Sequence, residues 1–254
     1  MKKLLLSTLF FSLLWGSCTP PETKTIPPSH GGIALSFDDN YVDEWVKIDE
    51  LLSKYQWKAT FYITKPHLLH KDHISKLHYL QDKGHELGAH GYFHFNALEY
   101  YNNNKINEYL KTEIDAELKY FKRKKFRIKS FSYPYGAHNE ALDSILSLKF
   151  STLRTTTYGI GLPKNQSCFY NKTNIIEGIG IDNHYPHHDM SYFFALLKYA
   201  KLNNKIVQFY AHKPVEKAVN KLEIDYEVLQ TICEYAQREK MTFYTSSQLL
   251  DLKK

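Results

Sequence analysis

The chain has 254 residues, of which 43% are hydrophobic and 24% are charged, and its formal net charge at pH 7 is +6. That length and hydrophobic content allow a sizeable core, in one α/β barrel or in two small domains. The charge balance is only mildly basic and the four arginines are scattered, so composition gives no support to a nucleic-acid-binding protein, and we expect no nucleic-acid partner.

The first 17 residues predict an export signal. Two lysines precede an apolar run over residues 4–15, which is shorter than the roughly 20 residues of a membrane span. Small residues at 16 and 17 then precede Cys18, an order that resembles a bacterial lipoprotein signal cleaved before that cysteine. An ordinary secretory signal cut near Ser17 is the alternative.

The following segment, residues 18–30, is polar and proline-rich and predicts a tether. We therefore expect an exported protein. The resemblance to a lipoprotein signal implies that a lipid on Cys18 anchors it to a bacterial membrane, in the periplasm or at the cell surface.

From residue 31 onward, short apolar runs alternate with helical patterns, which predicts a parallel sheet, open or closed into a barrel. The clearest helical pattern covers residues 104–125, and a second covers residues 223–239. Residues 158–173 contain two glycines and a proline without clear periodicity and predict a long loop. The expected strands are Ile33–Phe37, Ala59–Thr64, Glu86–Ala89, Ile128–Tyr133, Phe150–Thr155, Ile175–Ile181, Lys205–Ala211 and Met241–Thr245.

No internal repeat and no second linker is visible, so we expect one domain over residues 31–254. Within it lie Cys168 and Cys233, which could pair in an oxidising compartment, although two cysteines define no framework.

Polar residues suited to catalysis follow several of the expected strands. Asp38 and Asp39 end the first, His90 follows the third, and His212 follows the seventh. Because the carboxyl ends of parallel strands meet at one mouth, these side chains are expected to share a site. Taken alone, the two aspartates could instead cap the helix that follows them.

His90 and His94 are four residues apart, and on a helical turn that spacing would let two imidazoles reach one metal ion. An aspartate from another strand would complete a three-ligand set of the catalytic type. His184 and His188 have the same spacing in "DNHYPHHD". We expect His184, His187 and His188 to be surface loop residues, because only the first pair follows a buried strand.

The segments "SFDD", "HGYFH", "SYPYG" and "YAH" occur in the order and approximate spacing of the polysaccharide deacetylases, carbohydrate esterase family four. The chain resembles this family over about residues 31–250. The resemblance implies an α/β fold, a single distorted (β/α) barrel of seven to eight mostly parallel strands.

The resemblance also assigns roles to the first two segments. Asp39, His90 and His94 would be ligands of a divalent metal ion, most often zinc, and Asp38 would be the general base. A bound metal ion makes water more acidic, and a neighbouring carboxylate can accept the proton that this water releases.

The remaining segments supply the other groups. His212 matches the general acid that protonates a departing amine. The segment containing Pro134 and Tyr135 would bind substrate, with the Tyr135 N–H stabilising the oxyanion. Asp182 is a candidate for the aspartate that orients the acid histidine.

One position departs from the family pattern, because Ser132 stands where an arginine often pairs with the base. We hypothesise that Arg154 replaces it; substitution of Arg154 by methionine should then change the pH profile of activity.

The sequence therefore predicts a metal-dependent hydrolase acting on an acetylated polysaccharide or oligosaccharide, with N-acetyl groups of a glucosamine-containing glycan as the expected target. The resemblance implies hydrolysis of a carbon–nitrogen bond that is not a peptide bond. Three alternatives remain: an O-acetyl esterase on xylan-type polysaccharide, an inactive glycan-binding member of the family, and a barrel metalloenzyme of other chemistry such as a phosphoesterase.

Overall fold

The computed structural model describes residues 31–159 and 161–253. The predicted signal (1–17) and tether (18–30) lie outside this part of the chain. Within it, no helix combines the length and the apolar character that a membrane crossing requires.

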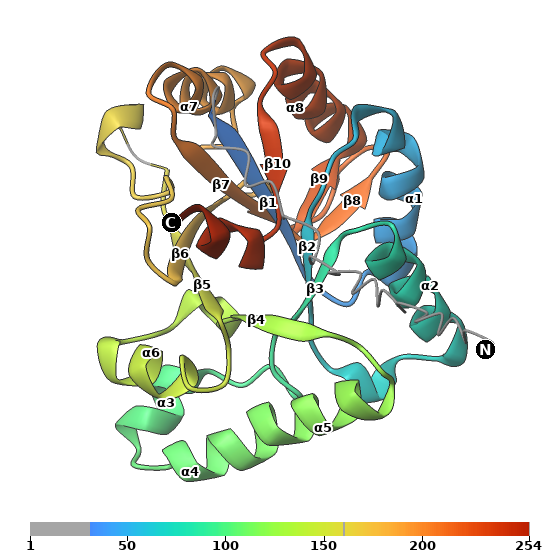
Figure 1. Ribbon diagram of the computed structural model, residues 1–254, viewed down its shortest axis with the longest axis vertical. Helices are drawn as coiled ribbons and strands as arrows, with labels where there is room; N and C mark the ends of the chain where they lie inside the picture. Colours follow the sequence, from blue (N-terminus) through green and yellow to red (C-terminus); the bar gives the residue numbers. More distant parts are fainter. Residues whose placement is uncertain (1–30, 160, 254) are drawn as a thin grey trace, which may run out of the picture.

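Seven parallel strands form a closed barrel (Figure 1). Each strand pairs with the next along the chain, and the seventh pairs with the first, which closes the sheet. The predicted α/β barrel is therefore confirmed. The strands are β1 (Gly32–Asp39), β2 (Thr60–Ile63), β3 (Glu86–Ala89), β4 (Ile128–Ser132), β5 (Thr152–Thr157), β6 (Ile175–Gly180) and β7 (Ile206–Ala211).

An eighth parallel strand, β10 (Thr242–Tyr244), pairs with the beginning of β1. It does so at residues 32–34, whereas β2 pairs with β1 only at residues 36–39. All eight expected strands are thus present. Because β2 is short and pairs only with the C-terminal half of β1, β10 pairs with the N-terminal half on the same edge.

Helices surround the barrel (Figure 1). The pattern predicted at residues 104–125 forms α4, a π-helical segment (Leu110–Asp115) and α5 in succession. The helix predicted at 223–239 begins only at Tyr226, because Glu223–Asp225 form strand β9, which pairs with β8 (Lys213–Val215) in a small sheet that the sequence did not predict. The helices are α1 (Val42–Leu52), α2 (Lys71–Asp82), α3 (Ala97–Asn102), α4 (Ile106–Tyr109), α5 (Ala116–Arg123), α6 (Glu140–Leu146), α7 (Met190–Leu202) and α8 (Tyr226–Arg238).

Along each strand, successive side chains point alternately to the outer face, which the helices cover, and to the barrel interior. In β1, Ile33, Leu35 and Phe37 belong to the main apolar core, whereas Asp38 contacts a side chain of β5 inside the barrel. Burial of the apolar side chains on the outer face therefore fixes the register of each strand. The side chains on the inner face can be polar and can contribute to a site.

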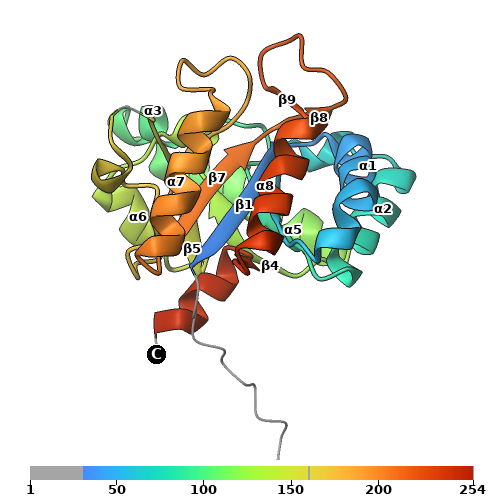
Figure 2. The same ribbon diagram turned by 90° about the horizontal axis from the view of Figure 1, so that it is seen from above.

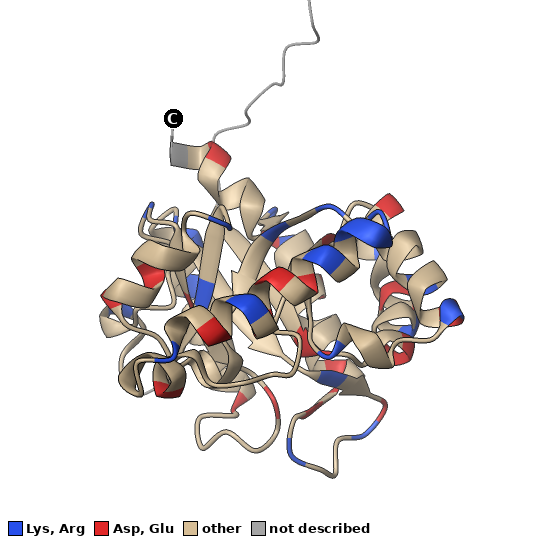
Figure 3. Ribbon diagram, turned by 90° about the horizontal axis from the view of Figure 1, so that it is seen from below, with Lys and Arg blue, Asp and Glu red and all other residues tan. Residues whose placement is uncertain are grey.

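The loops after β6 and after β8 project from the end of the barrel where β1 and β7 finish (Figure 2). The segment predicted to be a long loop is irregular in its described part, apart from one short helical turn at Pro163–Asn165 and an antiparallel bridge from Phe169 to Val207. Cys168 and Cys233 are both buried and unpaired. Basic and acidic residues are interspersed over the helices seen in Figure 3.

Candidate active site

The two neighbouring aspartates reach one mouth because the backbone turns at the second of them. Asp38 and Asp39 are the last residues of β1, and Asp39 has φ of +79°. This left-handed conformation is uncommon outside glycine, although aspartate tolerates it better than most residues. It breaks the in–out alternation that would otherwise send the carboxylates to opposite faces. Neither aspartate caps α1, whose N-cap is Tyr41.

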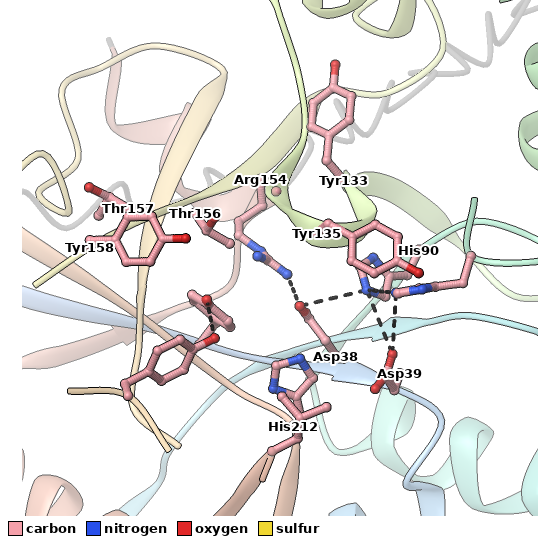
Figure 4. A pocket seen from close by; sticks show the side chains of 15 residues that line it. Asp38, Asp39, His90, Tyr133, Tyr135, Arg154, Thr156, Thr157, Tyr158 and His212 are labelled. Atoms are coloured by element: carbon pink, nitrogen blue, oxygen red, sulfur yellow. Dashed lines mark hydrogen bonds and ion pairs between the residues drawn. The ribbon is translucent and has the colours of Figure 1, made fainter. Parts of the chain in front are cut away.

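Asp39, His90 and His94 form a cluster of ligating atoms, of which Figure 4 labels Asp39 and His90. The two histidine Nε2 atoms are 3.2 Å apart, and Asp39 Oδ1 lies 3.6 Å from His94 Nε2 and 4.0 Å from His90 Nε2. Ligands bound tetrahedrally at about 2.0–2.1 Å would lie roughly 3.3 Å apart. Among the described residues this is the sole such group of three or more His, Cys, Asp or Glu side chains.

The protonation of the cluster also fits a metal ion. The carbonyl of Ser132 lies 2.8 Å from His90 Nδ1 and can accept its proton, which leaves Nε2 free to ligate. Burial lowers the pKa of His90, and burial together with the neighbouring His90 lowers the pKa of His94 to about 3. A neutral imidazole keeps a nitrogen lone pair for a metal ion, and the 3.2 Å between the two Nε2 atoms suits two ligands of one ion.

The segment carrying the two histidines is not the helical turn that their spacing suggested. Residues 90–96 are irregular, with φ of +87° at Gly91 and +69° at His94. A loop, rather than helical periodicity, brings the imidazoles together. A Cβ atom on Gly91 would lie 2.7 Å from Glu113 Oε2, so this close approach requires glycine.

Two buried carboxylates from the helix at 106–123 hold this loop. Glu117 accepts hydrogen bonds from the N–H groups of His90 and Gly91, at 3.1 and 3.0 Å. Glu113 accepts from the N–H groups of residues 93 and 95, at 2.9 and 3.1 Å. Both glutamates are 0% exposed. We call this pair the glutamate cradle; sequence inspection missed it, since both residues look like ordinary helix-surface glutamates.

Asp38 pairs with Arg154 of β5 inside the barrel (Figure 4). The same guanidinium donates to the hydroxyl of Ser132. Its Cζ atom also lies over the rings of Tyr62 and Tyr210, at 5.5 and 4.7 Å from their centroids. Burial by itself would raise the pKa of Asp38, but Arg154, His90 and His212 together lower it below its usual value.

His212 is held by Asp182 near Asp38. The Asp182 carboxylate lies 2.6 Å from His212 Nδ1 and accepts the His212 backbone N–H at 3.0 Å. Burial alone would lower the pKa of His212, but the hydrogen bond and charge of Asp182, together with the charges of Asp38 and Asp39, raise it. The Nε2 atom is therefore the end of the ring left for a substrate.

Tyr135 lies beside the cluster of Asp39, His90 and His94. Its φ is +62°, its side chain is 69% exposed, and its ring meets that of His94 edge-on at 4.8 Å. Among the described residues, none accepts a hydrogen bond from the Tyr135 N–H. Pro134 is buried and does not line the cavity, so its place is in the turn beneath Tyr135.

A cavity of about 230 Å³ joins these groups. Of the predicted site residues, Pro134 and Asp182 do not line the cavity, and Asp182 instead contacts His212 from behind it. The predicted residues that line it are Asp38, Asp39, His90, His94, Tyr135, Arg154 and His212. The structure also adds residues that sequence inspection did not select: Tyr133, Gly136, Thr156, Thr157, Tyr158, Tyr185, Tyr210 and Leu222.

The histidine-rich segment "DNHYPHHD" does not form a second metal cluster among the described residues. His187 and His188 instead contact the carbonyls of Gly180 and Ile181, at 2.7 and 3.0 Å. These contacts anchor the loop to the end of β6 and place its tyrosine, Tyr185, in the cavity wall.

The closed parallel barrel gathers carboxylate, imidazole and guanidinium side chains at the mouth where enzymes of this architecture place their active sites. The model of the polysaccharide deacetylase family matches residues 25–150, and the chain belongs to that family. The matched range ends before Arg154, Asp182 and His212, so their places in the site come from the tertiary structure.

Solved structures with this fold include several named deacetylases. The peptidoglycan deacetylase PdaC from Bacillus subtilis is 18% identical, covers 90% of this chain and 94% of its own, and has a TM-score of 0.56. The Xyl-CE4 domain of a multidomain xylanase from the hindgut metagenome of Trinervitermes trinervoides is 19% identical, with coverages of 88% and 91% and a TM-score of 0.53.

A family 4 acetyl xylan esterase from Clostridium thermocellum, solved with a cobalt ion, is 17% identical, with coverages of 87% and 90% and a TM-score of 0.54. At these identities the likeness concerns the fold alone. No curated protein matched the sequence.

Proposed function

We propose that the protein is a metal-dependent hydrolase that removes acetyl groups from a carbohydrate, with N-acetyl groups of a glucosamine-containing glycan as its substrate. One observation carries the proposal. Asp38, which pairs with Arg154, and His212, which pairs with Asp182, line the same cavity as the cluster of Asp39, His90 and His94.

Asp38 is suited to be the general base. Its carboxylate Oδ2 lies 3.8 Å from His90 Nε2, and Arg154 keeps it ionised despite burial. Its other oxygen, Oδ1, is buried without a hydrogen-bond partner among the described residues. Asp38 can therefore accept a proton from a water molecule at the cluster as that water attacks the acyl carbon.

The negative charge that develops on the acyl oxygen needs a hydrogen-bond donor. The unpaired N–H of Tyr135, beside the cluster, can supply one. The chemistry supplied by a divalent ion bound to Asp39, His90 and His94 is acidification of water and polarisation of the acyl carbonyl.

His212 is suited to be the general acid. An aliphatic amine is a poor leaving group unless it is protonated, so cleavage of an N-acetyl bond requires a donor near the nitrogen. Asp182 orients the His212 ring and favours its protonated form. A well-oriented acid of this kind contributes about 10²–10⁴-fold to the rate.

The choice of an amide substrate rests on this acid and on the family. One fold relative is named a peptidoglycan deacetylase and another an acetyl xylan esterase, and the same water attack serves both bonds. Ester cleavage needs less help from a general acid. Amide cleavage requires protonation of the departing amine, and His212, oriented by Asp182, can supply that proton.

Acetate release tests the proposal. The protein would be incubated with N-acetylglucosamine oligomers and, in parallel, with acetylated xylan, before chelation, after chelation and after addition of zinc. The substitution Asp38→Asn is the matched control. Zinc-restored release from the amino sugar supports the proposal, and a preference for xylan would replace the amide with an ester. No release from either substrate by metal-loaded protein would contradict it.

We further propose that the protein acts outside the cytoplasm, attached to a bacterial membrane through Cys18. The support is the signal-like pattern of residues 1–17 and the proline-rich segment behind it. Radiolabelled palmitate incorporation that disappears in Cys18→Ser would test this attachment.

A further inference from the structure

Two tyrosine hydroxyls meet in the wall of the cavity. Tyr210 belongs to β7, two residues before His212, and Tyr185 belongs to the loop between β6 and α7. Their hydroxyl oxygens are 2.5 Å apart, and both side chains line the cavity together with His212. The Tyr210 ring packs on the Arg154 guanidinium and meets the His212 ring edge-on at 5.9 Å. Through the Tyr210 ring, the hydroxyl pair is thus packed against Arg154, which pairs with the proposed base Asp38, and against His212, the proposed acid.

The sequence of β6 makes room for both rings. A Cβ atom on Gly180 would lie 2.1 Å from the Tyr185 ring, and one on Gly178 would lie 3.1 Å from the Tyr210 ring. Residues two apart on a strand face the same side, so the pattern Gly-Ile-Gly opens one patch of the barrel wall. The space that side chains would fill elsewhere is filled here by two tyrosines.

The pair has hydrogen-bonding capacity left over. One hydroxyl donates its proton to the other, and the second proton has no acceptor among the described residues. Burial raises the pKa of Tyr185 and raises the pKa of Tyr210 to about 12, so both hydroxyls are protonated at neutral pH. Covering this donor with an apolar group would leave it unsatisfied, at a cost.

We propose that the Tyr185–Tyr210 hydroxyl pair binds a hydroxyl group of the sugar unit that carries the acetyl group. A sugar hydroxyl is both donor and acceptor, so it can accept the free tyrosine proton and donate to a tyrosine oxygen. The methyl group of an acetyl can do neither, and its carbonyl can only accept. The inference rests on the proposed carbohydrate substrate and extends it to the recognition of one sugar unit, which suits a cavity of about 230 Å³.

Conservative substitutions test the pair. Tyr185→Phe and Tyr210→Phe each remove one hydroxyl and keep the ring, including the ring that packs on Arg154. The matched control is Tyr170→Phe, since the Tyr170 hydroxyl is buried without a partner and does not line the cavity. Binding of the N-acetylglucosamine trimer would be measured by calorimetric titration, and kcat/KM would be measured for the trimer and for 4-nitrophenyl acetate.

We expect each cavity variant to bind the trimer about tenfold more weakly and to lose kcat/KM for the trimer in proportion, as for a lost hydrogen bond of about 1.4 kcal/mol. The ratio of kcat/KM for the trimer to that for the nitrophenyl ester, which has no sugar hydroxyl, should fall by a similar factor. Tyr170→Phe should leave binding and the ratio unchanged.

Unchanged trimer binding in both cavity variants would overturn the inference, as would equal losses on the two substrates. Failure of the wild-type protein to bind either this trimer or an acetylated xylotriose would also overturn it. Trimer binding that weakens in the variants, without acetate release by the wild type, would support the inference and contradict the proposed deacetylase function.

Discussion

Arg154 and Asp38 stand 116 positions apart in the sequence and form a buried ion pair inside the barrel. Breaking such a pair by removing one partner typically costs about 3–5 kcal/mol, because the other charge is left uncompensated. We predict that Arg154→Met lowers the free energy of unfolding by an amount in this range and abolishes most of the activity. Urea unfolding followed by circular dichroism would measure the loss.

A double substitution shows whether the stability lost in Arg154→Met comes from the uncompensated charge of Asp38 or from lost packing of the arginine side chain. If the uncompensated carboxylate is the cause, Arg154→Met combined with Asp38→Asn should be more stable than Arg154→Met alone. Additive losses in the cycle would show that Arg154 stabilises the barrel without pairing with Asp38.

The acid role of His212 predicts a difference between bonds. We expect His212→Ala to lower kcat for an N-acetylglucosamine oligomer by about 10²–10⁴-fold and to lower kcat for acetylated xylan less, because an alcohol leaves more readily than an amine. Acetate release from both substrates measures the two effects. Equal losses on amide and ester would argue against this role.

The Asp182–His212 contact predicts a change in pH dependence. A general acid must be protonated, so activity falls as pH rises through its pKa, and Asp182 raises that pKa above 6.5. Asp182→Asn removes the charge and should shift the alkaline limb of the kcat profile to lower pH. Asp143→Asn, which alters the separate Asp143–His138 contact, serves as the control and should leave that limb in place. An unmoved limb in Asp182→Asn would contradict the assignment.

The proposed metal site at Asp39, His90 and His94 predicts selective loss of zinc when one of its residues is replaced. We expect His94→Ala to reduce bound zinc, measured by atomic emission after dialysis, to a small fraction of the wild-type content. His184→Ala is the matched control, because His184 belongs to the other histidine pair with four-residue spacing and is exposed. Equal zinc contents in the two variants would mean that the cluster is not the binding site.

The glutamate cradle predicts an indirect effect on the same site. Glu117→Ala leaves two backbone N–H groups of the ligand loop without acceptors, so we expect zinc affinity to fall about 10–100-fold, as for other outer-shell partners. Glu108→Ala, an exposed glutamate on the same helix, should bind zinc as the wild type does. Competition titration with a chelating dye measures both, and unchanged affinity in Glu117→Ala would show that the loop holds its shape unaided.

The barrel could be predicted from the sequence because its signals are local. An apolar run such as Ile33–Phe37 buries one face wherever it is placed, and parallel strands bring their polar ends to one mouth without further information. The three-residue strands β8 and β9 could not be predicted, since segments so short have no periodicity and pair only because the loop between them folds back.

By itself, therefore, the sequence determined the α/β class, the mouth of the barrel and the identity of the polar residues there. The tertiary structure decided how those residues work together. The loop conformation at Gly91 and His94 depends on carboxylates of a helix, in contacts that join residues 20 and 27 positions apart. The Asp38–Arg154 pair joins β1 to β5, and the Tyr185–Tyr210 pair joins the loop after β6 to β7, so each forms only when these segments meet in the folded chain. Charges and hydroxyls acquire their chemical roles from neighbours in space, and a linear pattern does not contain those neighbours.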